Sequence, residues 1–255
     1  DLSGNFINNS ACVIIEVSTG DVLAYIGNSL SENQAGHNGD VDIARAYRST
    51  GSILKPLLYA GMQNSGEILP NTLVADIPTR FPGFSPKNFD LSFSGAVPAS
   101  IALSQSLNIP SVKMLQNFSA ERFLALLERT GFTSFDKSAD HYGLSLILGG
   151  GETSLLELTG VYASLSRVLW RYNNDGKYYI EDYHPPVLIP QEYHSNITED
   201  TDPPLSASSI WLTYEALRKV NRPESEAGWQ YFSSSPNIAW KTGTSFGFRD
   251  AWAVG

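Results

Sequence analysis

Hydrophobic and polar residues alternate along residues 11–27, with one interruption at the polar turn Ser18-Thr19-Gly20-Asp21. Alternation with a period of two places every second side chain on the same face of a strand, and a short polar break between two such runs is typical of a hairpin. The pattern predicts adjacent strands at residues 11–17 and 22–26. The polar segment 28–40, rich in Gly and Asn, is expected to be a loop.

The period then changes, because the apolar residues from Ser52 to Ala60 are spaced as in a buried helix that begins near Ser52. Pro56 has no N–H to donate, which a helix tolerates in its first turn. Similar periodicity predicts further helices at residues 100–107, 111–116, 120–130, 155–169 and 206–220. The first of these is expected to end near Asn108-Ile109-Pro110, which is a helix-stop signal.

The strand pattern returns near the end of the chain, at residues 237–245 and 250–255. Strands at both ends with helices between them predict an α+β fold, in which an antiparallel sheet built from both chain ends is flanked by helices and accompanied by a helical subdomain. The Pro-, Gly- and aromatic-rich segment 67–98 is expected to be loop, and residues 171–202 form a polar, tyrosine-rich excursion.

Composition excludes several classes of function. The 255 residues are 42% hydrophobic, so the chain can bury a sizeable core, and its net charge of −9 lacks the basic excess that nucleic-acid binding needs. The four histidines are scattered, and neither a metal nor a cofactor is expected. The single cysteine, Cys12, lies in an apolar run and is expected to be buried. No stretch approaches the ~20 apolar residues that span a bilayer.

Three short motifs carry candidate chemistry. Ser52 and Lys55 form a Ser-x-x-Lys pair, and because positions i and i+3 share one helix face, the amine can reach the hydroxyl. Ser106 and Asn108 form a Ser-x-Asn motif at a predicted helix end. The sequence Lys241-Thr242-Gly243-Thr244 lies on a predicted strand. In this order the motifs are those of active-site serine acyl-transfer enzymes.

Each motif is weak evidence on its own. Ser134 and Lys137 form a second Ser-x-x-Lys pair, and Ser-x-Asn recurs at three other places. Lys-Thr-Gly, by contrast, occurs only once in the sequence. The additional copies of the other two motifs lack the helix and strand context that Ser52, Ser106 and Lys241 have. Gly149-Gly150-Gly151 lacks the Lys that follows in a phosphate-binding loop, so it is interpreted as a turn. Four aromatic residues near the last predicted strands could line a groove for substrate, but a place in the core is the preferred interpretation. They are Trp240, Trp252, Phe246 and Phe248.

Residues 49–56, 102–110 and 239–245 resemble the transpeptidase domain of class A penicillin-binding proteins. More narrowly, Asn221-Arg222-Pro223-Glu224 with Trp229, and residues 247–255, are similar to the penicillin-binding protein 1C branch of that family. The likeness runs over nearly the whole chain. It implies a fold like that of serine β-lactamases and penicillin-binding transpeptidases, with peptidoglycan stem peptides ending in D-Ala-D-Ala as substrates and β-lactams as inhibitors.

The resemblance also implies roles for the motif residues. Ser52 would be the nucleophile and Lys55 its base, for which the lysine pKa must fall by roughly 3 units through burial, the helix dipole and the charge of Lys241. Ser106 would relay a proton to the leaving amine, and Asn108 would hold a substrate amide and orient the lysine.

The strand motif is expected to bind the substrate. Thr242 and Thr244 suit the terminal carboxylate, with Lys241 adding charge. Gly243 would let the substrate backbone lie against the strand. The oxyanion hole would be the N–H groups of Ser52 and Thr244.

Family members usually carry a glycosyltransferase domain and a membrane anchor upstream. We therefore expect residues 1–255 to be a transpeptidase fragment from the periplasmic face of the bacterial inner membrane, without those parts and lacking a last strand and helix after Gly255. Two alternatives stay open: hydrolysis, as D,D-carboxypeptidase or β-lactamase, and a non-catalytic module that binds cell-wall peptide. Glu152 and Glu157 are interpreted as capping and surface residues because no Glu-x-x-x-Asn loop marks a deacylating base.

Overall fold

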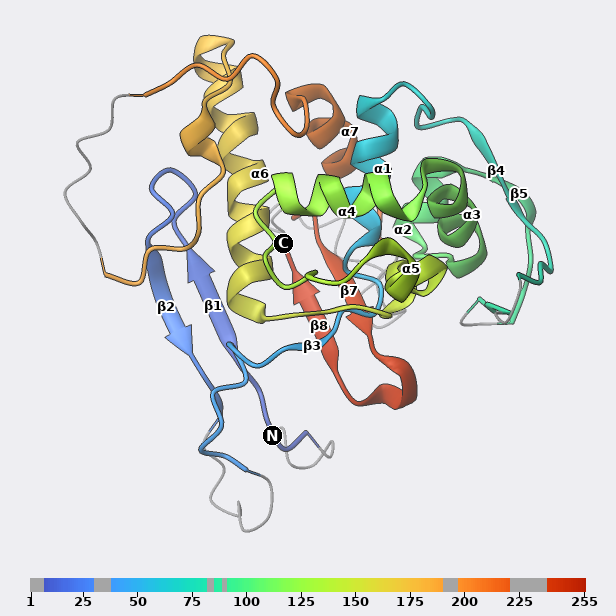
Figure 1. Ribbon diagram of the computed structural model, residues 1–255, viewed down its shortest axis with the longest axis horizontal. Coiled ribbons are helices and arrows are strands. Elements are labelled where there is room, and N and C mark those ends of the chain that lie inside the picture. The colour runs from blue at the N-terminus through green and yellow to red at the C-terminus, as the bar shows by residue number, and fades with distance from the viewer. Residues whose placement is uncertain (1–6, 30–37, 82–84, 89–90, 190–196, 221–237) are drawn as a thin grey trace, which may run out of the picture. The chain divides into compact units, whose positions relative to one another are not determined.

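The computed structural model describes residues 7–29, 38–81, 85–88, 91–189, 197–220 and 238–255 (Figure 1). The chain divides into two compact units. Unit 1 is formed by Asp1–Arg48, Leu127–Asp136 and Glu152–Pro204. Unit 2 is formed by Ser49–Leu126, Lys137–Gly151 and Leu205–Gly255. All eight candidate site residues of the three motifs belong to unit 2.

Unit 1 is built around one hairpin and one long helix. Strands β1 (Cys12–Ile15) and β2 (Val22–Ile26) pair in antiparallel register, as the alternating pattern predicts. Helix α6 (Leu155–Asp175), yellow in Figure 1, contacts β1. It begins after Ser154, whose side chain accepts a hydrogen bond from the Glu157 N–H, and it ends at Gly176 in the left-handed conformation.

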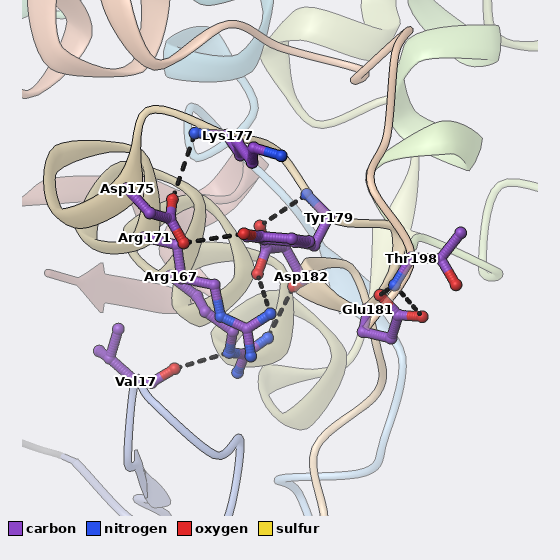
Figure 2. Close-up of polar contacts among 9 residues, drawn as sticks. All are labelled: Val17, Arg167, Arg171, Asp175, Lys177, Tyr179, Glu181, Asp182 and Thr198. Carbon is purple, nitrogen blue, oxygen red and sulfur yellow. Dashed lines mark hydrogen bonds and ion pairs between the residues drawn. The ribbon is translucent and has the colours of Figure 1, made fainter. Parts of the chain in front are cut away.

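A buried polar cluster connects α6 to the polar excursion that follows it (Figure 2). Arg167 is 1% exposed and donates to the carbonyls of Val17 and Asp182, each at 2.7 Å. The Arg171 guanidinium lies 3.1 Å from the Asp182 carboxylate, which sits on the short 3-10 helix η3 (Ile180–Asp182). Burial raises the pKa of Asp182, and Arg171 opposes that rise. The excursion is therefore tied to the hairpin by charge-assisted contacts.

Cys12 is exposed, and the prediction that it is buried is wrong. Along β1 the exposed positions are Cys12 and Ile14, whereas Val13 and Ile15 are half-buried. An unbroken apolar run predicts burial of both strand faces, but only one face of β1 is covered among the described residues. A sequence pattern cannot distinguish these cases, because covering a face depends on which element packs against it.

Unit 2 is organised around helix α1 (Lys55–Asn64), whose residues from Lys55 to Met62 are all buried. Helices α2 (Ala99–Ser104), α3 (Asn108–Phe118) and α7 (Ala207–Leu217) contact it. The remaining helices near this core are the short α5 (Ala139–Tyr142) and the 3-10 helix η2 (Gly143–Leu148), while α4 (Ala120–Arg129) contributes residues to both units. Two-residue strands β3 (Arg48–Ser49) and β6 (Glu152–Thr153) lie at the unit boundaries in the sequence.

Two helix boundaries differ from the predictions. Helix α1 begins at Lys55, not near Ser52, because tight turns precede it in which the N–H of Lys55 donates to the Ser52 carbonyl at 3.3 Å. The segment Asn108-Ile109-Pro110 begins α3 and does not end the preceding helix, which stops at Ser104. Proline is compatible with both a helix end and a first turn, so the sequence signal was ambiguous.

The segment 67–98, predicted as loop, contains a hairpin. Strands β4 (Leu73–Asp76) and β5 (Gly95–Pro98) pair in antiparallel register, with Leu73 opposite Pro98 and Asp76 opposite Gly95. The connection between the two strands is long, so the sequence contains no short turn that would indicate their pairing. The hairpin contacts α2 and α3, and this is how it reaches the candidate site.

The two strands predicted at the chain end are present as β7 (Lys241–Thr244) and β8 (Ala251–Val254), joined through the 3-10 helix η6 (Phe246–Phe248). They pair in antiparallel register, with Lys241 opposite Val254. The predicted α+β class is confirmed. Each strand pair forms its own two-stranded sheet among the described residues, and a single sheet built from both chain ends stays a prediction.

Within the described ranges, no helix is long and apolar enough to cross a membrane.

Candidate active site

The Ser52 motif begins on a turn that packs against the Lys241–Thr244 strand. Ser52 is half-buried and follows Gly51, whose φ of 51° falls in the left-handed region. A Cβ atom at Gly51 would lie 2.6 Å from the carbonyl oxygen and 2.7 Å from the nitrogen of Thr244. Only glycine allows this approach, so Gly51 brings the Ser52 turn into contact with β7.

The ammonium of Lys55 joins the first two motifs. Its nitrogen lies 2.7 Å from the Ser106 carbonyl oxygen, 2.7 Å from Oδ1 of Asn108 and 3.3 Å from the Leu107 carbonyl oxygen. The Ser106 hydroxyl is more distant, at 3.4 Å. Lys55 is 1% exposed, so these oxygens replace the water that would otherwise solvate its charge.

Ser106 adopts an uncommon backbone conformation, with φ of 56°. Such a conformation costs about 1–3 kcal/mol for a residue other than glycine and persists only where the surroundings enforce it. Here the Ser106 N–H donates to the Leu103 carbonyl at 2.9 Å, and the Leu107 N–H to the Ala102 carbonyl at 2.9 Å. This tight connection between α2 and α3 directs both the carbonyl and the hydroxyl of Ser106 to Lys55.

The orientation of the Asn108 amide is determined by a second contact. Its nitrogen donates to the Lys87 carbonyl at 2.8 Å, and a carbonyl can only accept. The other end of the amide, Oδ1, is therefore the end that accepts from Lys55.

Lys241, on β7, is also buried, with 2% of its surface exposed. Its ammonium donates to the Thr242 carbonyl oxygen. Burial lowers the pKa of Lys241 to about 8. Burial also lowers the pKa of Lys55 well below that of an ordinary lysine, and the charge of Lys241 lowers it further. Burial and the charge of Lys241 thus both oppose the protonation of Lys55, which is the electrostatic condition for a lysine base.

Side chains alternate along β7, so that Lys241 and Gly243 are buried while Thr242 and Thr244 are exposed. A Cβ atom at Gly243 would lie 2.7 Å from Cγ2 of Ile53 and 2.9 Å from the Thr50 carbonyl oxygen. Gly243 therefore has a packing role that the sequence did not indicate, against the turn that carries Ser52. The two exposed threonine hydroxyls are accessible to a ligand.

The structure brings all three motifs together, because Lys55 contacts Ser106 and Asn108, and Gly51 contacts Thr244. Among the described residues, no hydrogen bond joins the Ser52 hydroxyl to Lys55. Hydrogen bonds between a base and its nucleophile often tighten only when substrate binds. The decoy pair Ser134 and Lys137 lies outside any helix, as its sequence context suggested.

Sequence reasoning missed the role of Gly149-Gly150-Gly151. Gly151 accepts hydrogen bonds at its carbonyl from the N–H of Thr50 at 3.0 Å and from the Thr50 hydroxyl at 3.2 Å. Gly149, with φ of 102°, lies so close to Gly51 that a Cβ would be 2.9 Å from the Gly51 nitrogen. The predicted turn therefore supports the backbone just before Ser52. In the sequence, this close packing of backbones was indicated only by the three consecutive glycines.

Several other predictions about the surroundings of the site can be compared with the structure. Phe246 is 96% exposed and Phe248 is 74% exposed, so their assignment to the core is wrong. They lie in the 3-10 helix η6 at the tip of the β7–β8 hairpin, and both rings are largely exposed there. Trp252 is half-buried, and its indole N–H donates to the Ser49 carbonyl at 2.8 Å. The segment Asn221-Arg222-Pro223-Glu224 with Trp229 lies outside the described residues.

Comparison with known proteins adds a family assignment to this geometry. A family model described as "Penicillin binding protein transpeptidase domain" matches residues 10–253. Penicillin-binding protein 1C of Escherichia coli K12 is 31% identical over 248 residues, which cover 96% of this chain and 29% of that protein. Penicillin-binding protein 1A of Neisseria cinerea is 28% identical, over 95% of this chain and 30% of that protein. The chain thus spans less than a third of the length of these relatives.

Solved structures share the fold. The transpeptidase domain of penicillin-binding protein 3 from Burkholderia pseudomallei superposes with a TM-score of 0.72 at 17% identity, covering 99% of this chain and 77% of that one. Penicillin-binding protein 1A from Haemophilus influenzae superposes with a TM-score of 0.70 at 22% identity, covering 96% of this chain and 41% of that one. At these identities the likeness concerns the fold.

Proposed function

The chain belongs to the penicillin-binding protein transpeptidase domain family, and we propose that it catalyses peptidoglycan crosslinking with Ser52 as the nucleophile. The observation that carries this proposal is the buried Lys55 ammonium, held by Ser106 and Asn108 next to the Ser52 turn, with a lowered pKa. A lysine in this environment loses its proton more readily than an ordinary lysine and can act as a base near neutral pH.

In the proposed acylation step, the Ser52 hydroxyl oxygen attacks the carbonyl carbon between the two terminal D-alanines of a stem peptide. The hydroxyl proton passes to the neutral amine of Lys55. The N–H groups of Ser52 and Thr244 stabilise the oxyanion that forms. When the carbon–nitrogen bond breaks, Ser106 relays the proton from Lys55 to the departing amine of D-alanine. The acyl group remains as an ester on Ser52.

In the proposed second step, the amine of another stem peptide attacks this ester. Its proton passes to Lys55, and as the bond to Ser52 breaks, Lys55 gives this proton to the departing Ser52 oxygen. The product is a peptide crosslink. The exposed hydroxyls of Thr242 and Thr244 suit the donor carboxylate, and buried Lys241 behind them contributes positive charge.

The substrate class assigns the proposed activity to the periplasmic side of the inner membrane, where stem peptides are assembled into the wall. β-Lactams mimic the D-Ala-D-Ala bond and are proposed to acylate the same serine.

Hydrolysis is the less supported outcome. Glu157, one of two carboxylates considered as a deacylating base, accepts hydrogen bonds from the N–H and the hydroxyl of Thr133, each at 2.7 Å, and from the Thr153 hydroxyl at 2.5 Å. Burial acts to raise the pKa of Glu157, but the hydroxyl of Ser134, the hydroxyl of Thr153 and the two donors of Thr133 together lower it. A carboxylate so engaged is suited to a structural role at the start of α6.

Intact mass after incubation with a penicillin tests the proposal. We expect an adduct of one drug mass on the wild-type chain and on Ser134→Ala, which removes the serine of the decoy motif and leaves the three site motifs unchanged, and none on Ser52→Ala. A wild-type chain without an adduct, with the drug intact, would overturn the proposal in favour of a binding module. Loss of the drug without an adduct would indicate a β-lactamase instead.

A further inference from the structure

A buried pair of polar residues beside the site has no part in the chemistry proposed above. Asp76, at the end of β4, is 1% exposed, and Asn88 is 2% exposed. The Asn88 amide nitrogen donates to Oδ1 of Asp76 at 2.7 Å and to the Ser92 carbonyl at 2.9 Å. The other oxygen of Asp76 accepts from the Ser94 N–H at 2.8 Å. These contacts fix the orientation of the Asn88 amide, because its nitrogen is the donor in both of them. The amide oxygen of Asn88 faces another part of the chain.

That partner is the first turn of helix α3. The N–H groups of Asn108 and Ile109 both donate to Oδ1 of Asn88, at 3.0 Å and 3.3 Å. First-turn N–H groups have no acceptor within their own helix, and Leu107, the residue at the capping position, supplies none from its side chain. Asn88 therefore caps α3 from a distant part of the chain.

The neighbouring residue completes this arrangement. The Lys87 carbonyl accepts from the side-chain nitrogen of Asn108 at 2.8 Å, while Asn88 holds the Asn108 backbone. Both the position and the amide orientation of Asn108 are therefore set by residues 87 and 88. Oδ1 of Asn108 is left facing the Lys55 ammonium at 2.7 Å.

We propose that Asn88 and Asp76 are positioning residues for the acylation reaction, and that they act by holding Asn108 so that its side-chain oxygen accepts from Lys55. This proposal rests on the proposed function, in which neutral Lys55 is the base. Among the described residues, the side-chain hydrogen bonds of Asp76 and Asn88 go to each other, to Ser92 and Ser94, and to the start of α3. The two residues act through the start of α3, the element that carries the Lys55 acceptor.

The charged groups around Lys55 determine the sign of the effect. Lys241 on β7 disfavours the ammonium form, whereas oxygen acceptors from the Ser106–Asn108 connection favour it. Asp76 is the carboxylate of the positioning network and contacts Asn88. If Asn108 moves away, the ammonium loses an acceptor and the pKa of Lys55 falls. The acidic limb of the acylation rate against pH then shifts to lower pH.

The test is the second-order rate of acylation by a fluorescent penicillin between pH 5 and 10. We expect Asn88→Ala to lower the maximal rate about 10–100-fold, because displacement of a catalytic group by about 1 Å has effects of that size. We also expect its acidic limb to move down by about one pH unit, the size of one lost hydrogen bond to a charged group.

The control is Thr213→Val. Thr213 is 3% exposed on α7, donates to the Ser209 carbonyl at 2.8 Å and accepts from the Gln63 amide at 3.5 Å. Its replacement therefore removes two hydrogen bonds in unit 2, the second of them at the opposite end of α1 from Lys55. We expect this variant to melt at a lower temperature with an unchanged pH profile. An Asn88→Ala chain that is folded and has the wild-type profile would overturn the proposal.

A reciprocal exchange keeps the proposal testable if Asn88→Ala does not fold. Asn88→Asp alone places two carboxylates next to each other. The double variant Asn88→Asp with Asp76→Asn again has one amide donor between the two positions, and it keeps a side-chain oxygen at position 88 that can cap α3. We expect the double variant to recover at least about 10-fold of the rate lost in Asn88→Asp, since it removes a buried like-charge pair. No recovery would overturn the positioning role. A wild-type chain that penicillin fails to acylate would instead overturn the proposed function, and this inference with it.

Discussion

A lysine in water keeps its proton to about pH 10, and Lys55 departs from this because almost none of its surface meets solvent. The oxygens around it recover part of the lost solvation, and the charge of Lys241 acts against them. At the scale of residues, the candidate base is therefore a balance of burial, acceptors and a second cation. Changing one of these alters the pH at which the base is available.

The charge of Lys241 is one such component. Burial lowers its pKa to about 8, so we expect acylation of the wild-type chain to fall above that pH as Lys241 loses the charge that attracts the carboxylate. In Lys241→Met this basic limb should disappear. The acidic limb should move to higher pH, because the pKa of Lys55 rises once the neighbouring charge is removed. Rates measured with one penicillin over the pH range check both changes, and an unmoved acidic limb would contradict the coupling.

Ser106 combines a proposed role with backbone strain, since its φ is 56°. We expect Ser106→Gly to raise stability by about 1 kcal/mol because glycine adopts this conformation without cost. The same change should lower the acylation rate by about 10²–10⁴-fold through loss of the relaying hydroxyl. Ser106→Ala separates the effects, since it removes the hydroxyl and keeps the strain. Thermal melting and acylation rates measure them, and a Gly variant that melts below the Ala variant would disprove the strain argument.

At the scale of elements, the site is assembled by close backbone approaches. The Ser52 turn, β7 and the triple-glycine turn come together at Gly51, Gly149 and Gly243, where a Cβ would meet neighbouring atoms at 2.9 Å or less. No one element positions Ser52. The position of Ser52, the proposed nucleophile, therefore depends on glycines that lie in three separate segments of the chain.

Gly51→Ala tests this dependence. We expect it to lower stability by roughly 2–4 kcal/mol and the acylation rate by at least about 100-fold, since its Cβ would displace the Thr244 backbone. Gly66→Ala is a matched control, because Gly66 also has a positive φ, of 75°, but has no atom within 4 Å of the added Cβ. It should lose about 1 kcal/mol and no acylation. Equal losses of acylation in the two variants would contradict the close-approach argument.

At the scale of the whole molecule, the two buried lysines impose a pH dependence on folding. The pKa values of Lys55 and Lys241 are lowered in the folded state, so between those values and about 10.5 the unfolded chain binds more protons. The free energy of unfolding should therefore rise as the pH increases above 8. Tyr59, whose pKa is raised to about 12 by burial, limits the gain above pH 10, where the unfolded chain would lose the tyrosine proton.

Denaturant unfolding at pH 7, 8, 9 and 10 measures this effect. We expect the wild-type chain to gain about 3 kcal/mol or less from the lysine at position 241 over this range. Lys241→Met should lose that part of the gain and be more stable at pH 7, since its side chain carries no charge to bury. A wild-type stability that falls between pH 8 and 10 would show that other groups dominate.

Local patterns made the α+β class, most helices and the two terminal strand pairs predictable. Periodicity identifies an amphipathic element because it depends only on neighbouring residues, as for β1 with β2 and for α6. The hairpin of β4 and β5 was missed because its strands are far apart in the sequence and its segment is rich in Pro and Gly. The helix start at Asn108 was mistaken for a helix end because proline permits both.

The sequence by itself determined which groups are available: a serine and a lysine three residues apart, a Ser-x-Asn motif, and a single Lys-Thr-Gly sequence. Motifs of this kind can be found from sequence because their chemistry requires particular side chains at short spacing. The tertiary structure alone decided that Lys55 is buried against Ser106 and Asn108, that Gly51 packs on Thr244, and that Asn88, held by Asp76, caps α3. Burial, dielectric environment and hydrogen-bond partners arise from segments distant along the chain, and no local pattern encodes them.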